Sequence, residues 1–302
     1  MKKFLAAAIL ASNLFFMPTS HAEIKTYEGT DEYIMSEFET IDIAKQRAKQ
    51  KAERAAQEQA GVFIEANTEV VNMTVTKDEI RTMTGGILKI VDVKYEQESL
   101  PNVNGFIIRA TVKADIDTDD ITRWLYRDKG ERYELVEKNI ELQNAIAAQD
   151  KKIAELKKKL ADAETKQEQE KISAQFAAED KVFLSNRKME DAMKTYYAGN
   201  MSATLTLCSQ SIELNSGNAL AYSMRGVIFY LLKDYNGAIS DLNRAIELNP
   251  SEYKNFYNRG LARVKLNDYR AAAADFDVAL KLNPNDEDSR YNRDLCYRAM
   301  GY

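Results

Sequence analysis

The C-terminal half of the chain repeats one short phrase at a fixed interval. The letters IELNS occupy residues 212–216, IELNP residues 246–250 and LKLNP residues 280–284, so each copy starts 34 residues after the previous one. A period of this length is typical of solenoids, in which every repeat is one supersecondary unit that packs on its neighbours. The period therefore constrains the fold of this region more strongly than any other feature of the sequence.

Alignment of the copies shows further positions with the same spacing. An aromatic residue precedes a glycine, and an alanine, a bulky apolar residue, a second alanine and a proline follow. The glycine and the alanines let two helices approach closely, the bulky residues fill the seam between them, and Asn-Pro ends the second helix. The paired positions are Tyr222 and Phe256, Gly226 and Gly260, Ala238 and Ala272, Leu242 and Phe276, Ala245 and Ala279, and Pro250 and Pro284. This pattern resembles the tetratricopeptide repeat, which implies two antiparallel helices per unit.

Weaker copies flank the two clear ones. Within a repeat region at residues 181–302, we expect a degenerate repeat at about 185–216 and regular repeats at 219–250 and 253–284. A capping helix is expected at 287–302, because a lone amphipathic helix is the usual end of a solenoid.

The resemblance also implies a function, since the first helices of such repeats line a concave groove that holds a peptide or helix of another protein. The groove residues that it implies here are Met189, Met193, Tyr196, Ser223, Val227, Tyr230, Lys254, Tyr257, Leu261, Val264 and Tyr291. Aromatic and methionine side chains make adaptable recognition surfaces. The alternative for each residue is a place in the core of the chain itself, because a helix buries a stripe of about this width.

Residues 129–180 predict a charged helix with an apolar seam, a coiled coil or helical linker. The seam residues recur by sevens and are Leu135, Asn139, Leu142, Ile146, Ile153, Leu156 and Leu160. Isoleucine at a and leucine at d favour a parallel coiled coil, so we expect self-association as a dimer or trimer. The alternatives are a solitary helix that spaces two domains and a helix whose seam packs elsewhere. The apolar members end after Gln167, so the coil is expected to stop before the repeats.

Residues 1–22 predict a secretory signal peptide. Two lysines precede an apolar run from Phe4 to Met17, and Ser20-His21-Ala22 gives a small-x-small exit. The run is too short to span a bilayer, so the mature protein should start near Glu23, without an integral membrane segment, in the periplasm or outside the cell. Without the two lysines, 40 basic residues face 47 acidic ones, a net charge of −7. We therefore expect no binding to nucleic acid.

Removal of the signal peptide also removes the only histidine, His21. Serine and cysteine triads, imidazole metal sites and histidine acid-base catalysis then lack a required residue. The acidic run at 115–120 has Asp120 where a calcium loop needs glycine, so a helix cap is the better interpretation. We expect no enzyme, no metal and no cofactor, and we expect Cys208 and Cys296 to be small buried apolar residues without a mutual disulfide.

Residues 23–128 predict a small α+β domain. A helix over 42–61 carries a stripe of small residues that would let it lie close on a sheet, and Gly61 should end it. The stripe consists of Ala44, Ala48, Ala52, Ala55 and Ala56. Strands are expected at 61–70, 87–96 and 106–116, with a hairpin connection at 101–105 and a short helix at 119–127.

The segment from Ala48 to Val70, together with the letters TGGIL at 84–88, resembles the N-terminal domain of the flagellar assembly protein T and of related exported proteins. This resemblance implies a fold but no catalytic activity and no flagellar role. Lys45, Lys49 and Arg54 form a basic strip on the alanine helix. The strip fits a solvated helix face, and it also fits contact with an anionic polymer such as peptidoglycan.

These observations predict a multidomain protein with an α+β N-terminal domain, a central coiled-coil helix and an all-α tetratricopeptide-like solenoid. The function we expect is that of an exported, non-enzymatic adaptor or scaffold that binds a protein or peptide partner in the concave groove, with avidity from the coil. The alternative is a cell-wall or small-ligand binding protein that acts through its N-terminal domain.

Overall fold

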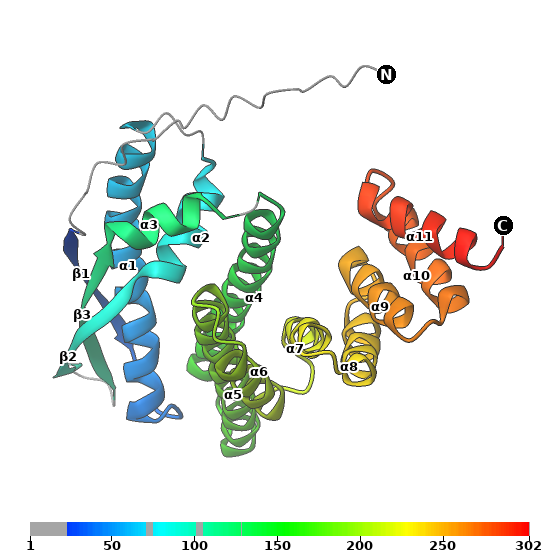
Figure 1. The fold of residues 1–302 in the computed structure, drawn as a ribbon. Helices are drawn as coiled ribbons and strands as arrows, with labels where there is room; N and C mark the ends of the chain where they lie inside the picture. Colours follow the sequence, from blue (N-terminus) through cyan, green and yellow to red (C-terminus); the bar gives the residue numbers. More distant parts are fainter. Residues whose placement is uncertain (1–22, 71–74, 101–104, 128, 302) are drawn as a thin grey trace, which may run out of the picture.

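The computed structural model describes residues 23–70, 75–100, 105–127 and 129–301 (Figure 1). The chain runs from a small sheet with its helices, through two long helices, into a row of shorter helices. The expected signal peptide at 1–22 and most of the hairpin connection at 101–105 lie outside the described residues. Within the described ranges, no helix is long and apolar enough to cross a membrane.

A three-stranded antiparallel sheet with three helices forms the N-terminal part. Its elements are β1 (Ile24–Ile34), α1 (Ile41–Val70), α2 (Lys77–Ile87), β2 (Lys89–Ser99), β3 (Phe106–Asp117) and α3 (Thr118–Leu125). The strand order is β1–β3–β2, so β3 is central. Alternate residues of β3, from Ile108 to Ile116, are fully buried, as expected for a strand with one covered face. The predicted small sheet with its packed helix is confirmed.

The alanine stripe of α1 explains how closely this helix lies on the sheet. Ala44, Ala48, Ala52 and Ala56 are fully buried against β1 and β3, whereas Ala55 is partly exposed. A Cβ atom at Gly29 of β1 would lie 2.1 Å from the carbonyl oxygen of Ala52. Only glycine at this position lets the strand and the helix backbones approach so closely.

The structure corrects the expected end of the alanine helix. Helix α1 continues through Gly61 to Val70, so the strand expected at residues 61–70 is wrong. Ile64, which fitted a strand pattern, is instead fully buried one turn beyond Ala60 on the same helix face. A short apolar run cannot by itself be assigned to helix or strand.

Two long helices connect the sheet to the repeats. Helix α4 (Lys129–Ala161) and helix α5 (Lys166–Tyr197) pack on each other and are joined by only four residues, which makes them an antiparallel hairpin. Ile153 and Leu156 of α4 pack with Ile172 and Phe176 of α5. The hairpin is closed in its middle by Gln149, whose amide donates to the carbonyl of Glu179 at 2.7 Å.

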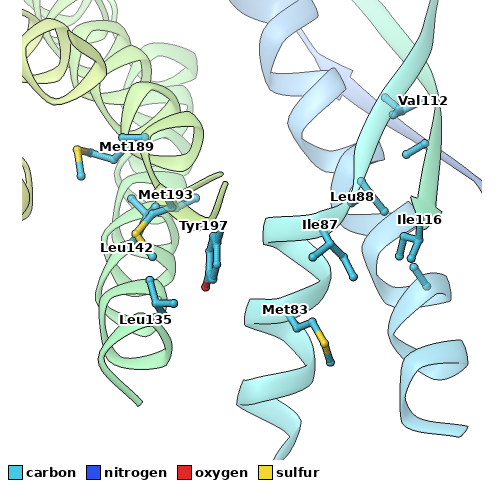
Figure 2. Close-up of a cluster of buried hydrophobic side chains, with 14 of the residues drawn as sticks. Met83, Ile87, Leu88, Val112, Ile116, Leu135, Leu142, Met189, Met193 and Tyr197 are labelled. Carbon is cyan, nitrogen blue, oxygen red and sulfur yellow. The ribbon is translucent and has the colours of Figure 1, made fainter. Parts of the chain in front are cut away.

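This hairpin corrects the prediction of a coil that ends near Gln167 and is free to self-associate. The apolar seam residues Leu135, Leu142 and Ile146 are each 1% exposed and belong to a core shared with the sheet and the first repeat (Figure 2). Asn139, expected to set the register of a dimer, donates to Thr82 Oγ1 at 3.1 Å instead. The seam therefore packs elsewhere in the same chain, which was the alternative that the sequence left open.

Buried ion pairs join α1 to α5 beside this core. Arg187 of α5 makes two hydrogen bonds to the carboxylate of Glu53, at 2.8 and 3.1 Å, and also pairs with Glu190. Glu53 is 3% exposed. Burial alone would raise the pKa of Glu53, but Arg187, Lys194 and Lys49 outweigh it and hold this pKa below its usual value.

The remaining helices form antiparallel pairs in sequence order. The C-terminal part of α5 packs on α6 (Met201–Leu214), α7 (Ala219–Leu231) on α8 (Tyr235–Leu248) and α9 (Tyr253–Lys265) on α10 (Tyr269–Leu282), and α11 (Glu287–Ala299) closes the row. Positive φ angles recur every 34 residues, at Gly199, Lys233, Asn267 and Gly301. The left-handed turn that ends each first helix therefore keeps the sequence period from the degenerate copy to the last helix.

We expect Leu142→Ala to lower the free energy of unfolding by about 2–5 kcal/mol, because it opens a cavity in the shared core. Ile140→Ala on the same helix, where the side chain is 38% exposed, should cost clearly less. Urea unfolding measures both values. The midpoint of unfolding should not change with protein concentration, since the seam is buried within one chain. A midpoint that rises with concentration would instead support the self-associating coil.

We expect Glu53→Gln to cost about 1–3 kcal/mol at pH 7, because it weakens charged hydrogen bonds to Arg187. The pKa of Glu53 is lower in the folded protein than its reference value of 4.5. Its contribution to stability is therefore complete above pH 4.5 and is lost as the pH falls through the folded pKa. Unfolding curves of both proteins from pH 7 to pH 3 should converge at low pH. Glu58→Gln, an exposed change on the same helix, should leave the curves unchanged, and a gap that persists at pH 3 would contradict the ion-pair explanation.

Candidate functional site

The predicted groove residues lie along the first helices of the repeats, but the chain itself fills the first part of the groove. Met189 is fully buried and Met193 is 4% exposed, in the same core as Leu135 and Leu142 of α4 (Figure 2). Tyr196 is partly buried against this core. The prediction that Met189 and Met193 contact a partner is therefore wrong for this fold, because no surface of either side chain is left to contact.

Ser223 also serves the packing of the repeats. Its hydroxyl is buried and donates to Asn255 Oδ1 at 2.6 Å, which ties α7 to α9. Tyr230 lies 5.7 Å from the Tyr235 ring, and Tyr257 lies 5.8 Å from the Phe276 ring, measured between ring centroids. These tyrosines thus have one face committed to the chain and the rest partly exposed.

The second half of the row remains open to solvent. Val227, Leu261 and Val264 are partly exposed, and Tyr291 of α11 is 61% exposed. Two further apolar residues belong to this surface and were missed, Leu231 at 48% and Leu295 at 38% exposure. The sequence did contain a signal for Leu295, because it lies 34 residues after Leu261 and 68 after Val227.

Lys254 shows that helix α4 forms a second wall of this surface. Its ammonium group pairs with the carboxylate of Glu137 and lies 5.2 Å from the ring centroid of Tyr133, both on α4. The open part of the concave row is therefore bounded by α4 on one side and by α9 and α11 on the other. We call the residues Tyr133, Glu137, Ile140, Glu141, Val227, Leu231, Lys254, Leu261, Tyr291 and Leu295 the two-walled surface.

A separate polar cleft of about 500 Å³ lies between α1, α2, α4 and α5. Carboxamide side chains from two of these helices, Gln57 and Gln143, reach it without a hydrogen-bond partner among the described residues. Asn139 lines the cleft with Thr82, and a Cβ atom at Gly86 would lie 2.7 Å from the Tyr197 ring, so this glycine lets the ring lie on α2. The cleft can offer hydrogen bonds to a small polar ligand.

The basic strip on α1 does not act as one unit. Arg54 lines the cleft and lies 3.6 Å from Asp150, whereas Lys49 pairs with Glu53. Lys45 lies over the Tyr95 ring of β2. Only Arg54 of the three could contact a ligand in the cleft.

Neither cysteine is placed to react. Cys208 and Cys296 are both buried and free. Burial raises the pKa of the Cys208 thiol to about 12, so it stays protonated and is a poor nucleophile near neutral pH.

Comparisons with known proteins concern the repeats. Two family models, each described as tetratricopeptide repeat, match residues 219–252 and 253–286. No curated protein matches the chain.

Solved structures similar to this chain are also repeat domains. One is the Arabidopsis OM64 TPR domain, with 26% identity over 39% of this chain and 98% of that one, at a TM-score of 0.39. Another is the first TPR of Spaghetti (RPAP3) bound to the HSP90 peptide SRMEEVD, with 23% identity, 40% and 96% coverage, and a TM-score of 0.39. Because both TM-scores are below 0.5, neither likeness carries an argument about the whole chain. Helices α7 to α10 thus form two tetratricopeptide repeats, as the 34-residue period predicted.

Proposed function

We propose that this protein is an exported, non-enzymatic adaptor that binds a protein or peptide partner on its two-walled surface. The observation that carries the proposal is the row of apolar residues on the first helices of two tetratricopeptide repeats, which stays exposed at Leu231, Tyr291 and Leu295. Exposed aromatic and aliphatic side chains in one row are typical of protein contact surfaces. Export rests on the signal-peptide pattern of residues 1–22.

The structure changes how such an adaptor would act. Avidity through a self-associating coil would need an exposed seam, and the seam of α4 is buried within the chain. Each chain then presents one two-walled surface, whose shape depends on α4 as well as on the repeats. Affinity for the partner must come from this surface alone.

A second candidate function is favoured by the polar cleft. An N-terminal domain that binds a small ligand or a cell-wall fragment would need a cavity with free hydrogen-bonding groups, and Gln57, Gln143 and Arg54 supply them there. The two functions use different residues, so one experiment can separate them.

A photo-crosslinking amino acid is placed in the native cell at Tyr291, at Gln57 or at Glu213, an exposed residue of α6 that serves as the control. We expect one discrete protein adduct from Tyr291 and none from Glu213, and Tyr291→Ala should weaken binding of the captured partner about 5–30-fold. An adduct from Gln57 alone would transfer the function to the cleft. No adduct from Tyr291 would refute the adaptor, and an uncleaved N-terminus in the purified protein would refute export.

A further inference from the structure

The two-walled surface has an apolar floor. Helix α7 lies between the α4–α6 helices and the α8–α9 pair, and it contacts both α4 and α9 (Figure 1). Val227 and Leu231 of α7 are only partly covered. Ile140 on α4 is 38% exposed, and Leu261 on α9 is partly exposed. A segment that enters between the walls would therefore meet aliphatic side chains on three helices.

The outer face of α4 is a distinct stripe. Tyr133, Glu137, Ile140 and Glu141 follow one another at spacings of three and four residues, so they share one side of the helix. Leu135, Leu142 and Ile146 are buried on the other side. One side of α4 is thus consumed by the core, and the other borders the repeats.

Carboxylates outnumber cations where the stripe meets the start of α9. Glu137, Glu141 and Glu252 are the acids, and Lys254 is already paired with Glu137. Burial raises the pKa of Glu141, and the charge of Glu252 raises it further, while the buried Lys138 acts in the opposite direction. Lys265 ends α9 about 16 Å away at 1.5 Å per residue, too far to neutralise this end through water and salt.

The carboxylate of Glu252 is not fully used. It accepts a hydrogen bond from the backbone N–H of Lys254 at 3.2 Å and so caps α9. No ion pair between Glu252 or Glu141 and a cationic side chain is found among the described residues. This end of the surface thus carries excess negative charge beside an apolar floor.

We infer that the two-walled surface binds a basic, apolar segment of a partner protein. A lysine or arginine of that segment contacts Glu141 and Glu252, and its apolar neighbours lie on Val227, Ile140 and Tyr291. The inference rests on the proposed function and names the chemistry of the partner. The surface continues the interface that α4 already makes with α7 and α9, so the partner segment packs beside a helix that belongs to the chain.

The test uses two labelled 14-residue helical peptides of leucine with lysine and of leucine with glutamate, and the full-length mature protein. Fluorescence anisotropy measures their dissociation constants. We expect the lysine peptide to bind at least tenfold more tightly than the glutamate peptide. Glu141→Gln with Glu252→Gln should weaken the lysine peptide about tenfold, and Glu213→Gln on α6 is the matched control. Glutamine at 252 can still accept the capping hydrogen bond, and the melting temperature checks that the variant folds.

Three results would overturn the inference. The glutamate peptide binds as well as the lysine peptide, the double variant binds like the wild type, or Glu213→Gln weakens binding as much as the double variant and so shows a net-charge effect. If the lysine peptide fails but Tyr291 still gives its discrete adduct in the cell, only the basic character of the partner is wrong. Loss of that adduct as well would refute the proposed function itself.

Discussion

The structure depends on the burial of one apolar seam, that of helix α4. Leu135, Leu142 and Ile146 leave water by packing into a core that also contains Val112 of the sheet and Met189 of the first repeat (Figure 2). Exclusion of apolar side chains from water drives this packing and has no preference between a second copy and another helix of the same chain. Because α5 follows after only four residues, it reaches the seam first, and the sheet, the hairpin and the first repeat become one body.

Charged pairs surround this core and determine how its parts align. Arg187, Glu53 and Glu190 hold α5 beside the polar side of α1, while the alanines on the opposite side of α1 rest on the sheet. A buried ion pair adds little net stability, since desolvation offsets much of the attraction. It does penalise any other register of the two helices, because a shifted helix would leave a charge buried without a partner. The polar cleft lies next to these pairs.

The shared core also decides which part of the repeats can contact a partner. Family resemblance predicted a groove along all first helices, yet the sheet and α4 occupy its beginning, where Met189 and Met193 are buried. The open part starts at α7, and α4 supplies Tyr133, Glu137 and Glu141 to its rim. Heptad analysis could not find this second wall, because it describes the apolar side of α4 and not the side that faces the repeats.

The sequence by itself determined the elements whose signal is local and repeated. A 34-residue period, the alanine stripe of α1 and the alternation in β3 each recur several times, so a single ambiguous residue does not change the result. Tertiary structure alone decided that α1 continues through Gly61, that the α4 seam packs within the chain, and that the start of the groove is filled. These outcomes depend on contacts between residues far apart in the chain, and the apolar pattern of a helix states that it must be covered but not by what.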